Sequence, residues 1–427
     1  MSITIPSPLL QPAGPVKSRA ISGKAALPLY LYAVSIASLF TIIGVLWDIS
    51  WHRSIGRDKF LSPPHILIYL GAIFAGLFSG IQVLWNSFYR KEAAAPSLIR
   101  VWGIFYSSLG SLFCIWGAIA MLTSAPFDDW WHNAYGLDVT ILSPPHTLLA
   151  LGMIFLQFGA CVSISKYLNA DAGAAAGANA GTIASTASGD TAADSRRYAM
   201  LQLLFVVGSS CLLCMVYTLG TDFLHIGRMR TPFFYLIVTV ATLTLLPAFG
   251  RALRLRWGMT AIAASYFLIV GGCNWVLQLF PAEPKLGPIL THITHFQSGP
   301  FPLLIVIPAL AMDIVMRRPG PAAAPSGRRD WVTALLLSLV FVLLLLAVQY
   351  PFSGFLLESP GARNWFFGAD ASYFGDSPAA PYRHKFYPGN IAALPELIRG
   401  LSIAVVAGWL CARISLRWGN WLQSIQR

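Results

Sequence analysis

The chain has 427 residues, of which 56% are hydrophobic and only 11% are charged. A soluble domain carries roughly 25% charged residues, so this composition excludes an ordinary soluble protein. The formal net charge is +12, but no basic and aromatic patch or nucleic-acid-binding module accompanies it. The charge therefore gives no reason to expect nucleic acid, and the expected partner is the lipid bilayer.

Ten apolar blocks follow one another along the chain. They lie near residues 28–47, 65–87, 99–123, 145–165, 198–219, 232–249, 257–280, 300–316, 331–350 and 393–415. A helix of about 20 apolar residues is long enough to cross a ~30 Å hydrocarbon core, and the blocks are of this order of length. The predicted fold class is therefore all-α, a polytopic transmembrane bundle of about ten helices.

Lys and Arg are distributed unevenly between the segments that connect these blocks. Alternate segments, beginning with the basic tail 1–27, hold 19 of the 29 basic residues. Because cytoplasmic segments of membrane proteins carry the excess of Lys and Arg, we expect both termini in the cytoplasm. The first apolar block is too long for the apolar region of a signal peptide, which favours a cytoplasmic tail over a cleaved signal.

Low-complexity sequence divides the chain into two halves. Residues 168–197 are rich in Ala, Gly, Ser and Thr, and we expect a flexible cytoplasmic linker there. It separates a four-helix half, 28–167, from a six-helix half, 198–427, whose outer loop 351–390 is rich in aromatic residues. All six cysteines lie inside apolar blocks, which is typical of small buried side chains and predicts no disulfide framework.

The four-helix half contains an internal repeat. Residues 47–71 and 127–152 each run from the end of one predicted helix into the start of the next, and each contains the string Leu-Ser-Pro-Pro-His. With one inserted residue, the aligned pairs are Asp48 and Asp128, Trp51 and Trp131, His52 and His132, Asp58 and Asp138, and Gly71 and Gly152. We therefore expect helices 1–2 and helices 3–4 to be a parallel duplication.

Each copy of the repeat contains three side chains that bind metals. The two sets are Asp48, His52 and His65, and Asp128, His132 and His146. In each set the aspartate and the first histidine are four residues apart, on one face of a helix. In the Ser-Pro-Pro-His string, the serine suits the N-cap and the first proline suits the first helical position. The second histidine then lies in the first turn of the returning helix, close to the preceding helix end. Two imidazoles and a carboxylate suit copper, zinc, iron or nickel.

A hydrogen-bonded polar cluster would explain a single set of this kind without a metal. Two observations favour ligation: the set occurs twice, and the predicted topology places all eight histidines at outer helix ends or in outer loops. Haem ligation by His65 and His146 is another alternative, which the neighbouring aspartates disfavour. We expect Asp58 and Asp138 to orient the ligating imidazoles, because a metal-bound histidine usually hydrogen-bonds a carboxylate or carbonyl through its other nitrogen. The sequence therefore predicts two metal sites that face the periplasm or the extracellular side.

The six-helix half contains two weaker forms of this ligand pattern. Asp222 and His225 are three residues apart, and so are His292 and His295, which places each pair on one helical face. Two interpretations stay open. These four residues form a third metal site or complete the first two, or they are polar interfacial residues without a metal.

The two ligand sets resemble those of the C subunit of the copper-dependent membrane monooxygenases, which oxidise methane or ammonia. That subunit has an Asp-x3-His-x12-His copper motif, followed by a second set with the spacing Asn-x3-His-x13-His. The first set here has the spacings x3 and x12 and the second has x3 and x13, so both match. The resemblance covers roughly residues 40–160. It implies copper at both sets and a role in oxygen activation on a small apolar substrate or ammonia.

The chain also departs from that family. Asp128 stands where the family has Asn, which adds a negative charge and favours a tightly held divalent ion. The six-helix half has no counterpart in that subunit, and the chain has no soluble cupredoxin-like region. The sequence is therefore compatible with two candidate functions. The first is a copper monooxygenase or its C-type subunit, acting with other subunits or as a homo-oligomer. The second is a non-enzymatic copper transporter or store at the outer face, although the scarcity of charge at the helix centres counts against an ion path through the bundle.

Overall fold

The computed structural model describes residues 26–56, 59–90, 98–136, 143–180, 190–317, 327–367 and 372–426. The long helices are α1 (Leu29–Ser54), α2 (Pro63–Phe88), α4 (Leu109–Tyr135), α5 (Pro144–Ala180), α6 (Asp190–Thr218), α7 (Pro232–Leu253), α8 (Gly258–Leu277), α9 (Val306–Met316), α10 (Gly327–Glu358) and α11 (Leu394–Ser424). The short 3-10 turns are η2 (Thr221–Phe223), η3 (Ile226–Arg228), η4 (Leu303–Ile305), η5 (Pro360–Ala362) and η6 (Pro388–Asn390). The antiparallel strands β1 (Ile99–Val101) and β2 (Phe105–Ser107) form a small hairpin.

Nine helices within the described residues are long and apolar enough to cross a membrane, and Leu303–Met316 is a shorter apolar helix. The prediction of an all-α transmembrane bundle is therefore confirmed. Helix α2 shows a lipid-facing surface, because an exposed apolar stripe repeats along it every three or four residues. The stripe consists of Ile66, Leu70, Ile73, Leu77, Ile81 and Leu84. Such a continuous apolar face is unfavourable in water and suits a hydrocarbon surrounding.

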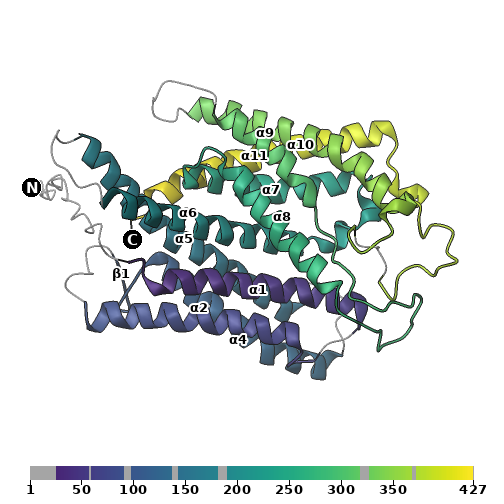
Figure 1. The fold of residues 1–427 in the computed structure, drawn as a ribbon, viewed down its shortest axis with the longest axis horizontal. Coiled ribbons are helices and arrows are strands. Elements are labelled where there is room, and N and C mark those ends of the chain that lie inside the picture. Colours follow the sequence, from purple (N-terminus) through teal and green to yellow (C-terminus); the bar gives the residue numbers. More distant parts are fainter. Residues whose placement is uncertain are drawn as a thin grey trace, which may run out of the picture.

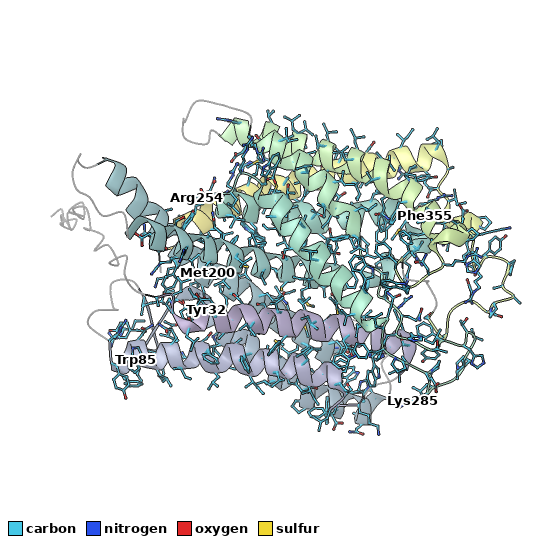
Figure 2. All side chains as sticks on the ribbon, in the orientation of Figure 1. Tyr32, Trp85, Met200, Arg254, Lys285 and Phe355 are labelled. Atoms are coloured by element: carbon cyan, nitrogen blue, oxygen red, sulfur yellow. The ribbon has the colours of Figure 1, made fainter. Side chains whose placement is uncertain are left out.

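The helices lie side by side along the long axis of the molecule (Figure 1). The start of α1, the end of α11 and the β hairpin lie at one end of the bundle (Figure 1). The opposite end, which we call the loop end, carries the segments that join α1 to α2, α8 to α9 and α10 to α11. Lys285 and Phe355 lie toward the loop end, whereas Trp85 and Met200 lie toward the other (Figure 2). The backbone N of Lys285 donates a hydrogen bond to Ile55 O (2.8 Å), which ties the α8–α9 segment to the end of α1.

The third predicted helix, 99–123, begins too early. Residues 99–107 form the β hairpin, whose turn places Trp102 and Gly103 at positive φ values of 49° and 72°. Helix α4 begins only at Leu109, where the Ser108 side chain accepts a hydrogen bond from the backbone N of Ser111. The apolar block therefore did not mark the start of the helix, because the N-cap serine and the tight turn before it determine where helical geometry begins.

The predicted linker 168–197 is largely helical in the structure. Helix α5 continues to Ala180 and α6 starts at Asp190, so only residues 181–189 of this stretch fall outside the described backbone. The high helix propensity of alanine outweighs the low complexity of the sequence here. The Arg197 guanidinium also pairs with the Asp171 carboxylate (Nε to Oδ2, 2.9 Å), which joins α6 to α5.

Glycines bring the two helices of each metal-ligand hairpin into close contact. A Cβ on Gly117 of α4 would lie 2.6 Å from Gly152 O of α5, and a Cβ on Gly152 would lie 2.9 Å from Gly117 O. A Cβ on Gly71 of α2 would likewise lie 2.9 Å from Ala37 O of α1. Small residues at such contacts let helix backbones touch. The aligned glycines of the sequence repeat therefore have the same packing role, while the parallel duplication of the hairpins stays a prediction.

Candidate metal centre

The first ligand set lies where α1 ends and α2 begins. Asp48 and His52 are one turn apart near the end of α1, and His65 is in the first turn of α2. The N-cap of α2 is Ser62, and a proline takes the first helical position. Oδ1 of Asp48 lies 3.5 Å from Nε2 of His65, and Oδ2 lies 3.8 Å from Nε2 of His52. The hairpin therefore places one carboxylate beside two imidazoles.

The second ligand set has the same arrangement on α4 and α5. Oδ1 of Asp128 lies 3.5 Å from Nε2 of His132 and 3.4 Å from Nε2 of His146. Helix α5 begins at Pro144, and the backbone N of His146 donates to Oγ of Ser143 at 3.4 Å. Proline at the first position and serine before it hold His146 in the first turn, as the sequence predicted.

The end of α4 orients the His132 imidazole. Its Nδ1 lies 3.1 Å from Gly136 O. A carbonyl oxygen only accepts, so Nδ1 carries the proton in this contact, and when the ring is neutral Nε2 has a lone pair. That lone pair faces the Asp128 carboxylate, which also only accepts. Two atoms that both only accept hydrogen bonds repel each other, and a cation bound between them would attract both. The metal-ligand pattern in the sequence does not include Gly136, although a glycine just past a helix end, here with φ of 84°, is a recognisable cap signal.

The separations in both sets can be compared with the distances expected for hydrogen bonds and for metal ligands. An N–H···O hydrogen bond spans about 2.7–3.2 Å. Two ligands that each lie ~2.1 Å from a tetrahedral ion are instead ~3.4 Å apart. The four Nε2-to-oxygen distances run from 3.4 to 3.8 Å. These four distances are longer than that range and fit both a carboxylate–imidazole ion pair and two donors around one ion.

Asp128 has a buried oxygen without a hydrogen bond. Its Oδ1 is inaccessible and accepts no hydrogen bond. Leaving a buried acceptor unsatisfied costs about 1–3 kcal/mol, and more when the group is charged. The same atom is the one that lies near both imidazoles of its set, so an ion at that point would satisfy it.

Neither set is already closed around an ion. Among the described residues, no group of three or more His, Cys, Asp or Glu side chains is arranged so that it could hold a metal. In each set the carboxylate is near both imidazoles, and closing the set requires side-chain rotation. The His52 and His146 side chains are 48% and 39% exposed, which leaves them room to rotate.

The four residues of the predicted third site lie on two separate segments of the loop end. Asp222 is exposed on η2, and His225 follows it. His292 and His295 are exposed on the segment between α8 and α9, where Nδ1 of His295 lies 2.9 Å from Oγ1 of Thr294. They do not make a metal-holding group in the described part of the chain. A third site therefore stays a prediction.

Asp58 and Asp138, expected to orient the imidazoles, lie outside the described residues. The surroundings of the second set are aromatic. The rings of Trp131 and Tyr135 are 4.5 Å apart, and Trp130 stacks on Phe127 at 5.9 Å. Trp and Tyr are enriched at the membrane–water interface, so this cluster is typical of an interfacial belt.

Comparisons with known proteins give no relative for this chain. No family model matches it, no curated protein matches it, and no solved structure matches it. The helices themselves define the class, a helical integral membrane protein. The likeness to the monooxygenase C subunit therefore rests on the spacing of the two ligand sets alone.

Proposed function

We propose that this membrane protein binds a copper ion in each of its two Asp/His/His sets. One observation carries the proposal: Asp48 and Asp128 each lie within 3.8 Å of two imidazole Nε2 atoms that come from two different helices. Imidazole and carboxylate donors suit copper, and they also suit zinc and iron. The matched spacings x3/x12 and x3/x13 favour copper among these.

The protein's own contribution to such a site is a charged, preoriented donor set. A carboxylate and two neutral imidazoles carry a single negative charge, which offsets part of the charge of a divalent ion. The Gly136 carbonyl favours the His132 tautomer with its proton on Nδ1, so Nε2 is the nitrogen that is placed to bind the ion. Three protein donors leave further positions open for a small molecule.

An oxygen-activating enzyme is the first candidate function, either a copper monooxygenase or its C-type subunit. Bound copper would supply the redox chemistry toward O₂. The chain would position the ion at the loop end of a bundle whose lateral surface is apolar. A small apolar substrate reaches such a site from the lipid, and ammonia reaches it from the aqueous side. Further subunits or a second copy of the chain would complete the enzyme.

Metal storage or delivery at one face is the second candidate function. The exposure of His52 and His146 favours it, because a ligand set that is open to solvent exchanges its ion readily. The buried Asp313 carboxylate of α9 offers no ion a path through the bundle. It accepts hydrogen bonds from the backbone N of Met259 and from the backbone N and Oγ1 of Thr260, which cap α8.

The binding proposal is tested by the metal content of the protein. The protein is purified in mild detergent with its lipids. We expect about two copper ions per wild-type chain, loss of one in either His52→Ala or His132→Ala, and loss of both in the double variant. The electron paramagnetic resonance spectrum should show nitrogen ligation. His384→Ala removes a histidine outside both sets and should retain both ions. Full copper content in the double variant would show that the assignment is wrong.

Oxygen uptake by the copper-loaded protein separates the two candidate functions. Consumption of O₂ that depends on a small hydrocarbon or ammonia, and that disappears in the double variant, supports the enzyme. Copper-loaded protein that consumes none, alone or reconstituted with its native membranes, would support metal handling instead.

A fusion reporter tests the proposed orientation. We propose that both termini are cytoplasmic and that the ligand sets face the periplasm or the extracellular side. A reporter joined after Gly136 should then be active only outside the cytoplasm. Cytoplasmic activity at that position would reverse the orientation without affecting the metal proposal.

A further inference from the structure

Three arginines lie at the end of the bundle opposite the loop end. Arg254 and Arg256 are in the short connection between α7 and α8, and Arg317 directly follows α9. Figure 2 shows Arg254 toward this end of the molecule. We call these three residues the arginine cluster. They belong to neither metal-ligand set and have no part in the proposed copper binding.

Arg256 and Arg317 are held close together. Nε and Nη2 of Arg317 donate hydrogen bonds to Arg256 O, at 2.8 and 2.6 Å. Both guanidinium groups also lie near the Trp257 ring, with the Cζ atom of Arg256 5.7 Å and that of Arg317 2.9 Å from the ring centroid. The two Cζ atoms are therefore no further apart than the sum of these distances, about 9 Å. One phosphate that accepts hydrogen bonds from two guanidinium groups spans a separation of this order, roughly 8 Å.

Carboxylates do not neutralise the arginine cluster. Several other arginines in the described part of the chain pair with a carboxylate, as Arg251 does with Asp330 at 3.1 Å. Within the described residues, the arginine cluster makes no ion pair. Asp313 is one turn before Arg317 on α9, but its two oxygens accept hydrogen bonds from the start of α8. Because like charges that are held close together repel each other, a bound anion would stabilise this arrangement.

The connection between α7 and α8 alternates cationic with apolar side chains. Arg254, Leu255, Arg256 and Trp257 follow one another, and all four are exposed. Tryptophan is enriched where a membrane meets water. Arginine beside it extends its charged end to the level of the lipid phosphates, while apolar side chains face the hydrocarbon. We therefore expect the arginine cluster at the level of the lipid headgroups.

Arg254 occupies a backbone position that favours glycine. It follows α7 in the left-handed region, with φ of 55° and ψ of 20°. Glycine is common at this position of a helix end, because a residue with a Cβ is disfavoured there. An arginine at this point weakens the helix end, which favours a role for its charge over a role in folding.

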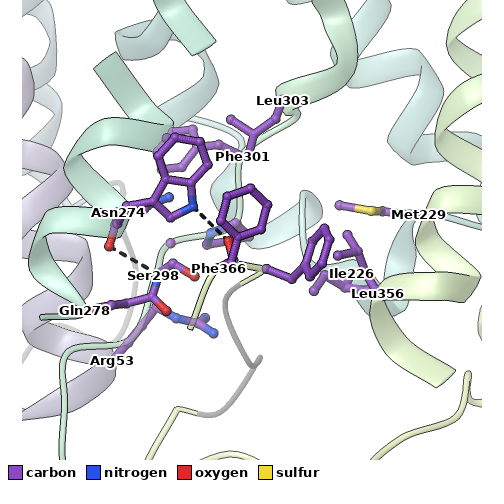
Figure 3. A pocket seen from close by; sticks show the side chains of 15 residues that line it. Arg53, Ile226, Met229, Asn274, Gln278, Ser298, Phe301, Leu303, Leu356 and Phe366 are labelled. Carbon is purple, nitrogen blue, oxygen red and sulfur yellow. Dashed lines mark hydrogen bonds between the residues drawn. The ribbon is translucent and has the colours of Figure 1, made fainter. Parts of the chain in front are cut away.

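A buried arginine at the loop end provides a comparison. Arg53 lines a cavity of about 90 Å³ together with Asn274 of α8 (Figure 3). Arg53 is only 8% exposed, which leaves little of its guanidinium for a ligand. Arg254 and Arg256 are instead exposed. A ligand in the membrane surface reaches them without any movement of the helices.

We propose that the arginine cluster binds the phosphate of an anionic phospholipid of the surrounding membrane. A guanidinium has five N–H donors, and Arg317 uses two of them on Arg256 O, so the others can donate to a phosphate. Three positive charges favour an anionic lipid over a zwitterionic one, because they repel the cationic group of a zwitterionic headgroup. The bilayer supplies lipid phosphate at the level of the arginine cluster, which favours a lipid over a free phosphate ion.

Native mass spectrometry of the full chain in detergent measures this binding. Phosphatidylglycerol is the anionic probe, and phosphatidylcholine with the same acyl chains is the zwitterionic one. The wild type should bind phosphatidylglycerol more tightly. Arg256→Gln and Arg317→Gln should each weaken that binding about tenfold, as expected for the loss of one charge-assisted contact, and leave phosphatidylcholine binding unchanged. Arg417→Gln is the control, because Arg417 is an exposed arginine of α11 outside the arginine cluster. An equal loss in Arg417→Gln, or no loss in the two cluster variants, would overturn the proposal.

Arg254→Gly separates lipid binding from folding. Glycine suits the left-handed position, so without added lipid this variant should unfold at the wild-type temperature or above it. It should nevertheless bind phosphatidylglycerol more weakly, and wild-type affinity would contradict the role assigned to the charge of Arg254. Inorganic phosphate distinguishes the source of the anion. Displacement of phosphatidylglycerol by an equal concentration of inorganic phosphate would mean that the site holds a free ion, and the lipid assignment would be wrong.

Discussion

Asp128 of α4 and His146 of α5 face each other across the second helical hairpin, with the carboxylate Oδ1 3.4 Å from the imidazole Nε2. They meet because Gly117 and Gly152 bring the two helix backbones into contact along the same hairpin. The second ligand set therefore depends on helix packing as well as on its own three side chains.

Replacing Gly152 with leucine should weaken metal binding at the second set. Its Cβ would lie 2.9 Å from Gly117 O and 2.9 Å from the backbone N of Met121, so α5 must move away from α4. We expect loss of the second copper ion and a destabilisation of about 1–3 kcal/mol. Copper content in a His52→Ala background reports the second set alone. Gly80→Leu in α2, where a Cβ meets nothing within 4 Å, is the control. Equal copper loss in the two leucine variants would contradict the packing argument.

Asp128→Asn should lower the affinity of the second set for divalent ions. Asparagine keeps the shape of the side chain but removes the charge, and we expect about tenfold weaker binding or more. Competition with a chelator, again in the His52→Ala background, gives the dissociation constant. Asp129→Asn is the matched control, because Asp129 is exposed and contacts Asn133 instead of a histidine. A larger effect at Asp129 would make that residue the ligand.

Asp330→Asn should destabilise the bundle at the end opposite the metal sets. This carboxylate of α10 is buried and pairs with Arg251 of α7 at 3.1 Å and Arg413 of α11 at 3.9 Å. Removing its charge leaves two guanidinium groups without their shared partner, at a cost of about 1–3 kcal/mol. Thermal unfolding in one detergent measures the change.

Glu358→Gln provides the comparison for that measurement. Glu358 is 45% exposed and lies 3.5 Å from Arg230. Because an exposed ion pair contributes about 0–1 kcal/mol, this variant should unfold close to the wild-type temperature. A larger fall in unfolding temperature from Glu358→Gln than from Asp330→Asn would mean that burial does not determine how much an ion pair contributes to stability.

Tyr387 should ionise at a higher pH than an ordinary exposed tyrosine. Its hydroxyl donates to the Asp376 carboxylate, with 3.0 Å to each oxygen. That hydrogen bond, together with desolvation and the nearby charges, raises the pKa of Tyr387 above 10.0. Because the folded-state pKa is raised, the contact stabilises the loop fully below the unfolded pKa and is lost as the pH rises through the folded value. The difference in phenolate absorbance between the wild type and Tyr387→Phe should therefore develop above pH ~10. In Asp376→Asn the same difference should move to lower pH, and an unchanged position would exclude the carboxylate as the cause.

Local patterns predicted the start of the ligand hairpins well. Proline at the first helical position places His65 and His146 in first turns, and Oγ of Ser143 also accepts a hydrogen bond from the backbone N of His146. Both effects act within a few residues. The apolar block 99–123 failed as a guide to a helix start, because hydrophobicity does not distinguish a membrane helix from a β hairpin packed beside one.

Contacts between segments that are far apart in the chain could not be predicted from the sequence. The roles of Gly117 and of the Gly136 carbonyl depend on which backbone atoms come near them. The cavity at Asn274 is formed by α1, α8, α10 and two loops, and no spacing within one segment reveals such a space.

By itself, the sequence determined that this is an all-helical membrane protein and that one ligand pattern occurs twice at its helix ends. Those features follow from composition, block length and the periodicity of a helix, which act along one segment of chain. Only the tertiary structure decided that each aspartate lies within 3.8 Å of two imidazoles, and that Oδ1 of Asp128 is buried without a hydrogen bond. These distances result from how helices pack, which depends on side chains far apart in the chain.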